Sequence, residues 1–338
     1  MSFVEVNTAM SNEVLSVVKF LKDDILLSSY YNNNVELRSI VQEPDSLSAP
    51  VLANIVAPDV ISCVQQTESN SILVGLNDGT LRYLDLENTK VSEPILQASD
   101  EGVGINFCKK IENNMIVASS YEGSIWLVDP RSPAKLFRYN TSGRIFALDT
   151  TSRYVTLGKS GQEVEIFDIR RLDSSLMVRL TGLRYQITSL KTFPDGEGYA
   201  IGSIDGRISI DAFNELQDAS KRKFAFKCHR QKDSASGVDH VYPVTALTFH
   251  PKYDTLFTSG GDGHVCIWDW GRRKRVKQLP SAPAPHFISH MDLNHEGTCV
   301  VVGVTNDSFL RSQNGNAEKI LSKIYCRELT ESESKPKQ

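Results

Sequence analysis

The chain has 338 residues, of which 40% are hydrophobic and 23% are charged, a balance typical of a globular protein with a sizeable core. Its formal net charge of -4 excludes general electrostatic attraction to DNA or to an anionic membrane as the basis of function. No apolar run approaches the roughly 18 residues of a spanning helix, and the start MSFVEVNTAMSNEV lacks the features of a signal peptide.

The cysteines are scattered and form no C-x-x-C pair. They are Cys63, Cys108, Cys228, Cys266, Cys299 and Cys326. Scattered single cysteines favour reduced, mostly buried thiols in an intracellular protein.

One pattern recurs along the chain: a strand of small residues, a turn of the Asp-Gly type and a strand of alternating hydrophobicity. In chain order the copies are LLSSYYNNNVELRS (26–39), LVGLNDGTLRYLD (73–85), VASSYEGSIWLVD (117–129), TLGKSGQEVEIFD (156–168), AIGSIDGRISIDAF (200–213), FTSGGDGHVCIWD (257–269) and VVGVTNDSFLRS (301–312). The first copy is weak and the last is degraded.

The glycine-rich copy TSGGDGHVCIWDW (258–270) raises the alternative of a phosphate-binding loop. Such a loop needs a helix after it, because the helix N-terminus holds the anion. In this chain the residues HVCIWDW alternate with the two-residue period of a strand. Asp262 and Gly263 therefore predict a hairpin turn, since glycine tolerates the positive φ that such turns need.

A second marker repeats independently, as a short apolar strand ahead of each turn pattern. These strands begin at Val17, Ile61, Ile105, Ile145, Ile187, Val244 and Ile288. Successive starts are separated by 44, 44, 40, 42, 57 and 44 residues. Seven units with a period near 44 residues match the blades of WD-type propellers.

The repeats predict an all-β fold, a seven-bladed WD-repeat β-propeller that occupies residues 1–330 as one domain. We expect the blades to begin near residues 14, 60, 104, 144, 186, 243 and 287. The N-terminal strand FVEVN (3–7) should close the ring as the outermost strand of the last blade, beside KIYCREL (323–329). The polar tail 331–338 is expected to be disordered.

The 57-residue interval is about a dozen residues longer than the repeat needs, and the extra length lies within 214–244. Insertions between blades become loops on one face, often a binding face. A closed ring gives no reason to expect more than a monomer.

The sequence offers weak signals for catalysis or metal binding. His286, His290 and His295 fall close together, but a strand would place neighbours on opposite faces, and surface or structural roles are favoured. The aspartates that end the repeats belong to different blades, so we expect them to bond adjacent strands rather than to form a catalytic pair. They are Asp85, Asp129, Asp168 and Asp269. We predict no catalytic residues, no metal site and no cofactor.

Two basic runs leave alternatives open. GRRKRVK (271–277) suits a nuclear-localisation or nucleic-acid patch as well as a solvated hairpin at the rim of blade 6. KRKFAFKCHR (221–230) interleaves cations with Phe224 and Phe226, which could stack on RNA bases or accompany a phosphopeptide site. Its alternation equally fits a blade strand with one buried face.

The run from GYAIGSIDGRISID through KRKFAFKCHR to VYPVTALTFHP and SGGDGHVCIWD resembles the budding-uninhibited-by-benzimidazole family of mitotic checkpoint WD-repeat proteins. RYQITSL, DPRSP and KIYCRELTESESKPK fit the same family. A sister family, the nuclear-pore mRNA-export propellers, shares the FKCHR and SIDGR stretches. That branch implies the alternative of an mRNA-export adaptor that binds a nucleoporin segment and RNA.

The resemblance to the checkpoint family implies a propeller without enzymatic activity, located in the nucleus, at kinetochores and in the cytoplasm. It implies two kinds of partner on one face of the ring. These are phosphorylated Met-Glu-Leu-Thr-type repeats of a kinetochore scaffold, and the short acidic motifs of checkpoint kinases or their pseudokinase relatives. Basic groups on that face would suit a phosphothreonine, which brings roughly -1.5 to -2 charges.

Carried over by position, the resemblance implies a peptide-binding face with Arg207 in SIDGR and Lys227 in FKCHR as its cations. Tyr185 lies in the RYQITSL motif. Tyr30 and Tyr121 stand where the family usually has tryptophan, so they keep an aromatic surface of smaller area. Thr188 stands where the family tends to have a phosphate-binding arginine, which puts phosphothreonine recognition in question.

Overall fold

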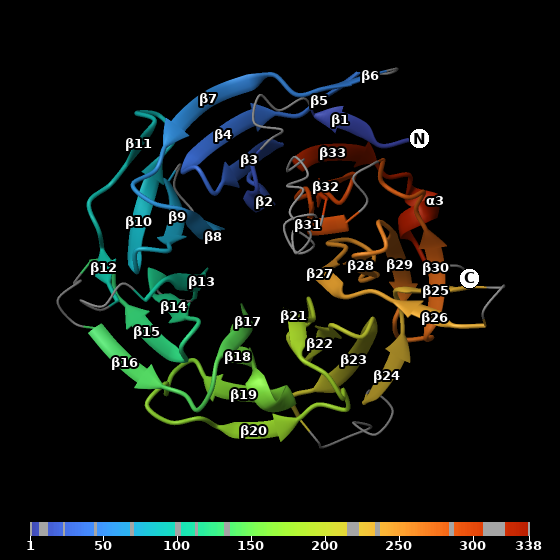
Figure 1. Ribbon diagram of the computed structural model, residues 1–338. Coiled ribbons are helices and arrows are strands. Elements are labelled where there is room, and N and C mark those ends of the chain that lie inside the picture. Colours follow the sequence, from blue (N-terminus) through green and yellow to red (C-terminus); the bar gives the residue numbers. More distant parts are fainter. Residues whose placement is uncertain are drawn as a thin grey trace, which may run out of the picture.

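The computed structural model is a ring of seven small antiparallel sheets around a central axis (Figure 1). It describes residues 2–6, 13–22, 24–43, 46–67, 71–98, 103–111, 114–131, 136–214, 223–233, 237–283, 287–306 and 322–336. The seven-bladed all-β propeller predicted from the repeats is confirmed. Among the described residues, no helix is long and apolar enough to cross a membrane.

The blades follow one another in chain order, and within each of the first six the strands follow one another from the inner to the outer edge. Blade 1 consists of β2 (Leu15–Phe20), β3 (Ile25–Tyr30), β4 (Asn34–Ser39) and β7 (Val51–Val56). Blade 2 consists of β8 (Ile61–Gln66), β9 (Ser71–Leu76) and β10 (Thr80–Asp85), with β11 (Lys90–Val91) and β12 (Leu96–Gln97) outside. Blade 3 consists of β13 (Ile105–Lys110), β14 (Ile116–Ser120), β15 (Ser124–Val128) and β16 (Leu136–Asn140). Blade 4 consists of β17 (Ile145–Thr150), β18 (Tyr154–Lys159), β19 (Glu163–Asp168) and β20 (Met177–Leu180). Blade 5 consists of β21 (Ile187–Thr192), β22 (Gly198–Ser203), β23 (Arg207–Ala212) and β24 (Phe224–Lys227). Blade 6 consists of β27 (Val244–Phe249), β28 (Leu256–Gly260), β29 (Val265–Asp269) and β30 (Lys274–Gln278).

Blade 7 closes the ring with strands from both ends of the chain (Figure 1). Its order is β31 (Phe287–Leu293), β32 (Cys299–Thr305), β33 (Ser322–Glu328) and, outermost, β1 (Val4–Val6). Val4 pairs with Cys326 and Val6 with Ile324. The predicted closure by the N-terminal strand is therefore confirmed, and it pairs an edge that would otherwise be exposed.

Smaller elements lie between or beyond the blade strands. Two hairpins are described, β5 (Val41–Glu43) with β6 (Ser46–Ser48), and β25 (Arg230–Lys232) with β26 (Asp239–Val241). A short 3-10 helix, η2 (Ser160–Gln162), lies between β18 and β19. The hairpin β25–β26 occupies the long interval between blades 5 and 6, which is where the sequence predicted an insertion.

The core is divided into apolar layers, most of which lie between neighbouring blades. In one layer, Val17 and Leu27 of blade 1 pack with Ile61 and Ile72 of blade 2. Each such side chain contributes about 1.5–3 kcal/mol when it is removed from water. A single blade could not bury both of its faces, so stacking in a ring supplies the stability that an isolated blade lacks.

Side chains near the start of the inner strands add polar links between blades. The Asn106 Nδ2 donates to the Ile145 carbonyl at 2.8 Å, and the Ser62 hydroxyl donates to the Ile105 carbonyl. His290 Nε2 lies 3.0 Å from the Ser16 carbonyl and joins blade 7 to blade 1. These links stiffen the wall of the central channel.

The C-terminal segment corrects a prediction, because residues expected to be disordered form a helix, α3 (Glu331–Ser334). Thr330 and Glu333 make a capping box, which satisfies backbone donors at the helix start. Glu333 also pairs with the buried Arg327 at 2.8 Å, and Thr255 Oγ1 donates to the Ser334 carbonyl at 2.9 Å. The sequence did not predict these two contacts, because the composition of the tail is polar.

The aspartates that end the repeats also differ from expectation, because they close turns rather than bond adjacent strands. Asp85 accepts from the Glu87 backbone N–H at 2.9 Å, Asp129 from Arg131 at 3.0 Å and Asp168 from Arg170 at 2.9 Å. This is the local Asx-turn geometry that aspartate favours. These residues therefore end the third strand of their blades.

Candidate functional site

One face of the ring carries the turns that join the second and third strands of each blade, and we call it the turn face. Among the described residues, the large hydrophobic side chains exposed there or just beside it include Tyr31 at 58%, Tyr121 at 51%, Tyr185 at 55% and Ile204 at 49%. Exposed aromatic groups that flank charged residues are typical of protein-binding surfaces.

Tyr31 and Tyr121 lie in the turns that join the second and third strands of blades 1 and 3. Partial burial raises the pKa of Tyr121, and the nearby Tyr31 phenol raises it further. Tyr121 is one of the residues predicted for the binding face; the structure places it on the turn face, and its role in binding stays a prediction.

The prediction for Tyr30 is wrong, because this side chain is fully buried. Tyr30 is the last residue of β3, and its hydroxyl lies 3.5 Å from Glu36 Oε2. Glu36 is itself buried and pairs with Arg38 at 3.1 Å. The exposed position is held by the next residue, Tyr31, which the sequence motif could not distinguish because both tyrosines follow the same SS dipeptide.

The predicted cations Arg207 and Lys227 are direct register partners on β23 and β24. Like charges placed opposite each other in a sheet destabilise it, so this pair invites an anion. Arg207 pairs with Asp205 at 3.1 Å. The side chain of Lys227 is exposed, and its ammonium group makes no hydrogen bond or ion pair with any residue that the structure describes.

Arg230 adds a third cation that the site prediction did not include. Its Nη2 donates to the Asp205 carbonyl at 3.2 Å, and its Nη1 lies 3.8 Å from Asp239. The signal for it was present in the sequence, since Arg230 ends the same KCHR motif that supplied Lys227.

Tyr185 lies beside these cations. The Ile204 backbone N–H donates to the Gln186 carbonyl at 3.0 Å, which holds the Tyr185 segment against the turn between β22 and β23. Tyr185, Ile204, Arg207, Lys227 and Arg230 therefore make one surface, which we call the blade 5 patch. It combines two exposed apolar groups with three cations, of which Arg207 lies beside Asp205 and Arg230 beside Asp239.

Thr188 has a structural contact in place of a ligand-binding one. Its hydroxyl donates to the Val244 carbonyl at 2.5 Å and so joins blade 5 to blade 6. The hydroxyl is thus engaged inside the ring wall, and the cations of the blade 5 patch come from β23, β24 and the segment after it.

A buried polar network fixes the backbone between Lys227 and Arg230. His229 Nδ1 lies 2.8 Å from Asp262 Oδ1, and His229 Nε2 lies 3.1 Å from Thr258 Oγ1. Trp268 Nε1 donates to the same hydroxyl at 3.1 Å. Because all these groups are partnered inside the protein, the two flanking cations stand on a rigid base.

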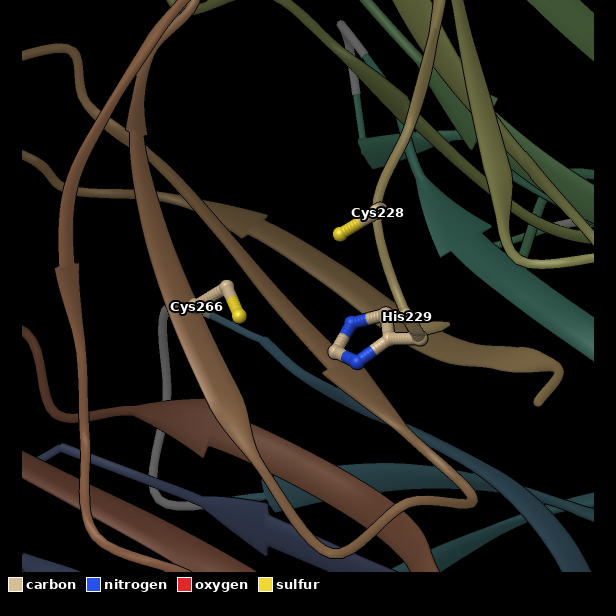
Figure 2. Close-up of side chains that lie close together, drawn as sticks. All are labelled: Cys228, His229 and Cys266. Carbon is tan, nitrogen blue, oxygen red and sulfur yellow. The ribbon is translucent and has the colours of Figure 1, made fainter. Parts of the chain in front are cut away.

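Two thiols stand beside this imidazole. Cys228 precedes His229, and Cys266 comes from β29 of blade 6. Figure 2 shows the two sulfur atoms and the ring of His229 around a common space. The sequence predicted no metal site because it contains no short ligand motif, whereas 37 residues separate His229 from Cys266 and only the fold brings them together.

All six cysteines are buried and free, as predicted from their scatter.

The structure describes two of the three clustered histidines. His290 lies in β31, where burial lowers its pKa to about 4 and keeps it neutral, and His295 is exposed beyond the end of that strand. His286 lies outside the described residues.

The central channel holds a second group of charges around a cavity of about 380 Å³. Lys109 and Lys191 lie 3.0 and 3.2 Å from the carboxylate of Asp149. Burial alone would raise the pKa of Asp149, but the two lysines together lower it well below its usual range. Asp149 is therefore charged at neutral pH and already engaged.

The basic run at 271–277 forms the turn before β30 and most of that strand, at the rim of blade 6. The Arg273 guanidinium lies 4.2 Å from the ring centre of Phe224. Phe226 packs on Trp268 with ring centres 4.9 Å apart. The two phenylalanines of KRKFAFKCHR are therefore covered, in agreement with a blade strand that has one buried face.

Comparison with known proteins gives one match to a family model, described as WD domain, G-beta repeat, over residues 234–269. The spindle assembly checkpoint protein bub3 of Schizosaccharomyces pombe is 33% identical over 259 residues, which cover 76% of this chain and 75% of that protein. The chain belongs to the Bub3 family of WD-repeat proteins. This result confirms the resemblance inferred from the sequence motifs.

Other members of the Bub3 family match over shorter regions. The mitotic checkpoint protein bub-3 of Caenorhabditis elegans is 32% identical over 228 residues, which are 67% of this chain and 65% of that protein. The matched region of the Arabidopsis thaliana protein BUB3.1 is 64% of its length, so both alignments span slightly less than two thirds of the relative.

A longer alignment joins this chain to the WD40 repeat protein poxJ of Penicillium oxalicum. The two are 26% identical over 314 residues, which are 92% of this chain and 89% of that protein.

Proposed function

We propose that this chain is a non-enzymatic scaffold of the spindle assembly checkpoint. Its turn face would bind phosphorylated repeats of a kinetochore scaffold and the short acidic motifs of checkpoint kinases or pseudokinases. The names of its relatives, mitotic checkpoint and spindle assembly checkpoint proteins, support this placement. The proposal implies a protein of the nucleus, the kinetochore and the cytoplasm that acts as a monomer.

The observation that carries the proposal is the opposition of Arg207 and Lys227 on β23 and β24. Two cations in register are unfavourable in the free protein, and a phosphothreonine with roughly -1.5 to -2 charges would reverse that effect. Arg230 lies beside them, held by its contact with the Asp205 carbonyl. The guanidinium groups can bind phosphate oxygens in a bidentate manner, while Lys227 supplies a point charge.

The aromatic groups would supply the apolar part of the contact. Tyr31, Tyr121 and Tyr185 expose about half of their surface or more. Methionine and leucine side chains of a Met-Glu-Leu-Thr-type peptide could pack on such rings, because tyrosine offers a large rigid surface with few rotatable bonds. The charged and the apolar contacts would thus come from different blades.

The alternative of an mRNA-export adaptor receives less support from the geometry. It predicts that bases stack on Phe224 and Phe226, and these rings are covered by Arg273 and Trp268. The exposed rings of the turn face are tyrosines on separate blades, with 51% to 58% of their surface accessible. A stacking platform for single-stranded RNA needs adjacent open rings.

Isothermal titration calorimetry of the full chain with two peptides tests the proposal. One peptide carries the Met-Glu-Leu-Thr motif with phosphothreonine, and the other carries unmodified threonine. We expect the phosphopeptide to bind about 100-fold more tightly, since charge-assisted pairs contribute about 1.5–3 kcal/mol. Equal affinities would contradict phosphate recognition, and tighter binding of single-stranded RNA than of either peptide would favour the adaptor function.

A further inference from the structure

The buried cluster of Cys228, His229 and Cys266 has the composition and spacing of a metal site. One potential ligand atom from each residue lies within 4.8 Å of the others, and all three side chains are buried. In Figure 2 the two sulfur atoms and the imidazole surround a common space at the junction of blades 5 and 6. No peptide-binding role accounts for two thiols at this position.

The imidazole of His229 is oriented for coordination. Asp262 Oδ1 lies 2.8 Å from Nδ1, and because a carboxylate can only accept, the ring proton resides on Nδ1. The lone pair of Nε2 is therefore directed away from Asp262, toward Thr258 at 3.1 Å. Carboxylate–histidine pairs of this kind hold the second nitrogen for zinc in many proteins.

Thr258 places an oxygen where a fourth ligand would stand. Its Oγ1 lies 3.1 Å from His229 Nε2 and 3.2 Å from Cys228 Sγ. Neighbouring ligand atoms of a tetrahedral zinc ion are about 3.3–3.8 Å apart, given the usual bond lengths. The Trp268 N–H donates to the same oxygen at 3.1 Å and fixes its position. Modest outward shifts of these atoms would admit the ion.

The backbone makes room for this arrangement at Gly260. A Cβ at that position would lie 2.4 Å from both Cγ and Nδ1 of His229. The same Cβ would lie 2.8 Å from Asp262 Oδ1, so only glycine leaves room for the contact between His229 Nδ1 and Asp262 at the end of β28. The close fit explains how a histidine and two cysteines from separate segments can converge.

We propose that Cys228, His229 and Cys266 bind one Zn²⁺, with the Thr258 hydroxyl or a water molecule as the fourth ligand. Nitrogen and sulfur donors in this ratio suit zinc, whereas Mg²⁺ and Ca²⁺ require oxygen. Binding would release the two thiol protons to solvent and form two Zn–S bonds, with no change in oxidation state. The ion would tie the segment after β24 to β29 and so clamp blade 5 to blade 6 beside Lys227.

The test measures zinc in the full chain purified without chelator. We expect one Zn²⁺ per chain by mass spectrometry of the metal, and displacement by CoCl₂ should give the visible absorption of sulfur-bound Co²⁺. In competition with a chromophoric chelator, Cys266→Ala should lower the affinity for Zn²⁺ at least about 100-fold, and Asp262→Asn should lower it about 10- to 100-fold. Cys299→Ala is the matched control, because Cys299 is equally buried and lies outside the cluster.

The melting temperature provides a second measurement, because each protein can be compared with and without a chelator. Addition of a strong chelator should lower the melting temperature of the wild type and of Cys299→Ala, and should leave Cys266→Ala unchanged. A wild-type chain that binds neither Zn²⁺ nor Co²⁺ would overturn the proposal. So would equal zinc affinity of Cys266→Ala and Cys299→Ala, or a chain that loses two hydrogens through a Cys228–Cys266 disulfide and binds no metal.

Discussion

The charges of the central channel and those of the blade 5 patch are arranged in opposite ways. In the channel, Lys109 and Lys191 share the carboxylate of Asp149 at 3.0 and 3.2 Å. In the patch, Arg207 and Lys227 oppose each other in register, and Lys227 is exposed. Both channel lysines therefore engage the Asp149 carboxylate inside the ring wall, whereas in the patch Arg207 lies beside Asp205 at 3.1 Å and Lys227 remains available for a ligand.

The largest expected effect concerns the channel. Asp149→Asn keeps the shape of the side chain but leaves Lys109 and Lys191 without their counter-charge. We expect the free energy of unfolding to fall by about 2–4 kcal/mol, slightly less than for a fully buried pair because the lysines are partly exposed. Urea denaturation followed by circular dichroism measures it. An unchanged midpoint would mean that the channel charges contribute no stability.

In the blade 5 patch, a substitution should change the affinity for the peptide and leave the stability of the fold nearly unchanged. Lys227→Glu reverses an exposed charge that has no intramolecular partner in the described structure, so stability should change by less than about 0.5 kcal/mol. Its affinity for the phosphopeptide should fall about 100-fold, which corresponds to about 2.7 kcal/mol. Fluorescence anisotropy with a labelled peptide measures this, and Lys90→Glu, an exposed lysine on β11, is the matched control. Similar losses in both variants would show that binding depends on overall charge alone.

A pH titration separates the two regions further, because burial lowers the pKa of His290 in the channel wall to about 4. The unfolded chain takes up the proton below about pH 6.5 while the folded chain does not, so stability is full above that pH and declines as pH falls toward 4. We expect a loss of about 1–2 kcal/mol between about pH 7.5 and pH 5. Urea denaturation of the wild type and of His290→Gln at both pH values measures it, and the variant should show a smaller loss. An identical pH dependence would assign the effect to other groups.

The smallest effect should come from Tyr31, the exposed tyrosine of blade 1. Tyr31→Ala removes an exposed ring, so it should lower the affinity for both peptides about tenfold, or about 1.4 kcal/mol, and leave the melting temperature unchanged. Tyr30→Ala is the informative partner variant, since it empties a buried site and should lower stability instead. A loss of peptide affinity in a folded Tyr30→Ala protein, with none in Tyr31→Ala, would reverse the structural assignment.

The ring itself could be predicted from the sequence because each blade repeats the same local rules. Small residues, an Asp-Gly turn and an alternating strand recur with a period near 44 residues, and closure follows from the unpaired strand at the N-terminus. Arg207, Lys227, Tyr121 and Tyr185 could be placed for the same reason, since their positions within a blade are fixed by the turns.

Other features depend on contacts that no local pattern encodes. Tyr30 and Tyr31 are adjacent and chemically identical, and only the fold, which packs Tyr30 into an apolar layer with Leu15 and Ile324, decides which one is buried. The thiols near His229 come from two segments that meet between blades. The helix at Glu331–Ser334 depends on Arg327, a residue of the preceding strand that supplies a buried partner for Glu333.

The most direct test of the proposed function is a double-mutant cycle between the phosphate and the cations of the blade 5 patch. Calorimetry would measure the phospho- and unphosphorylated peptides against the wild type and against Arg207→Ala/Lys227→Ala. We predict that the phosphate improves binding about 100-fold in the wild type and less than about threefold in the double variant. The same preference for phosphate in both proteins would contradict the assignment of these cations to the phosphate.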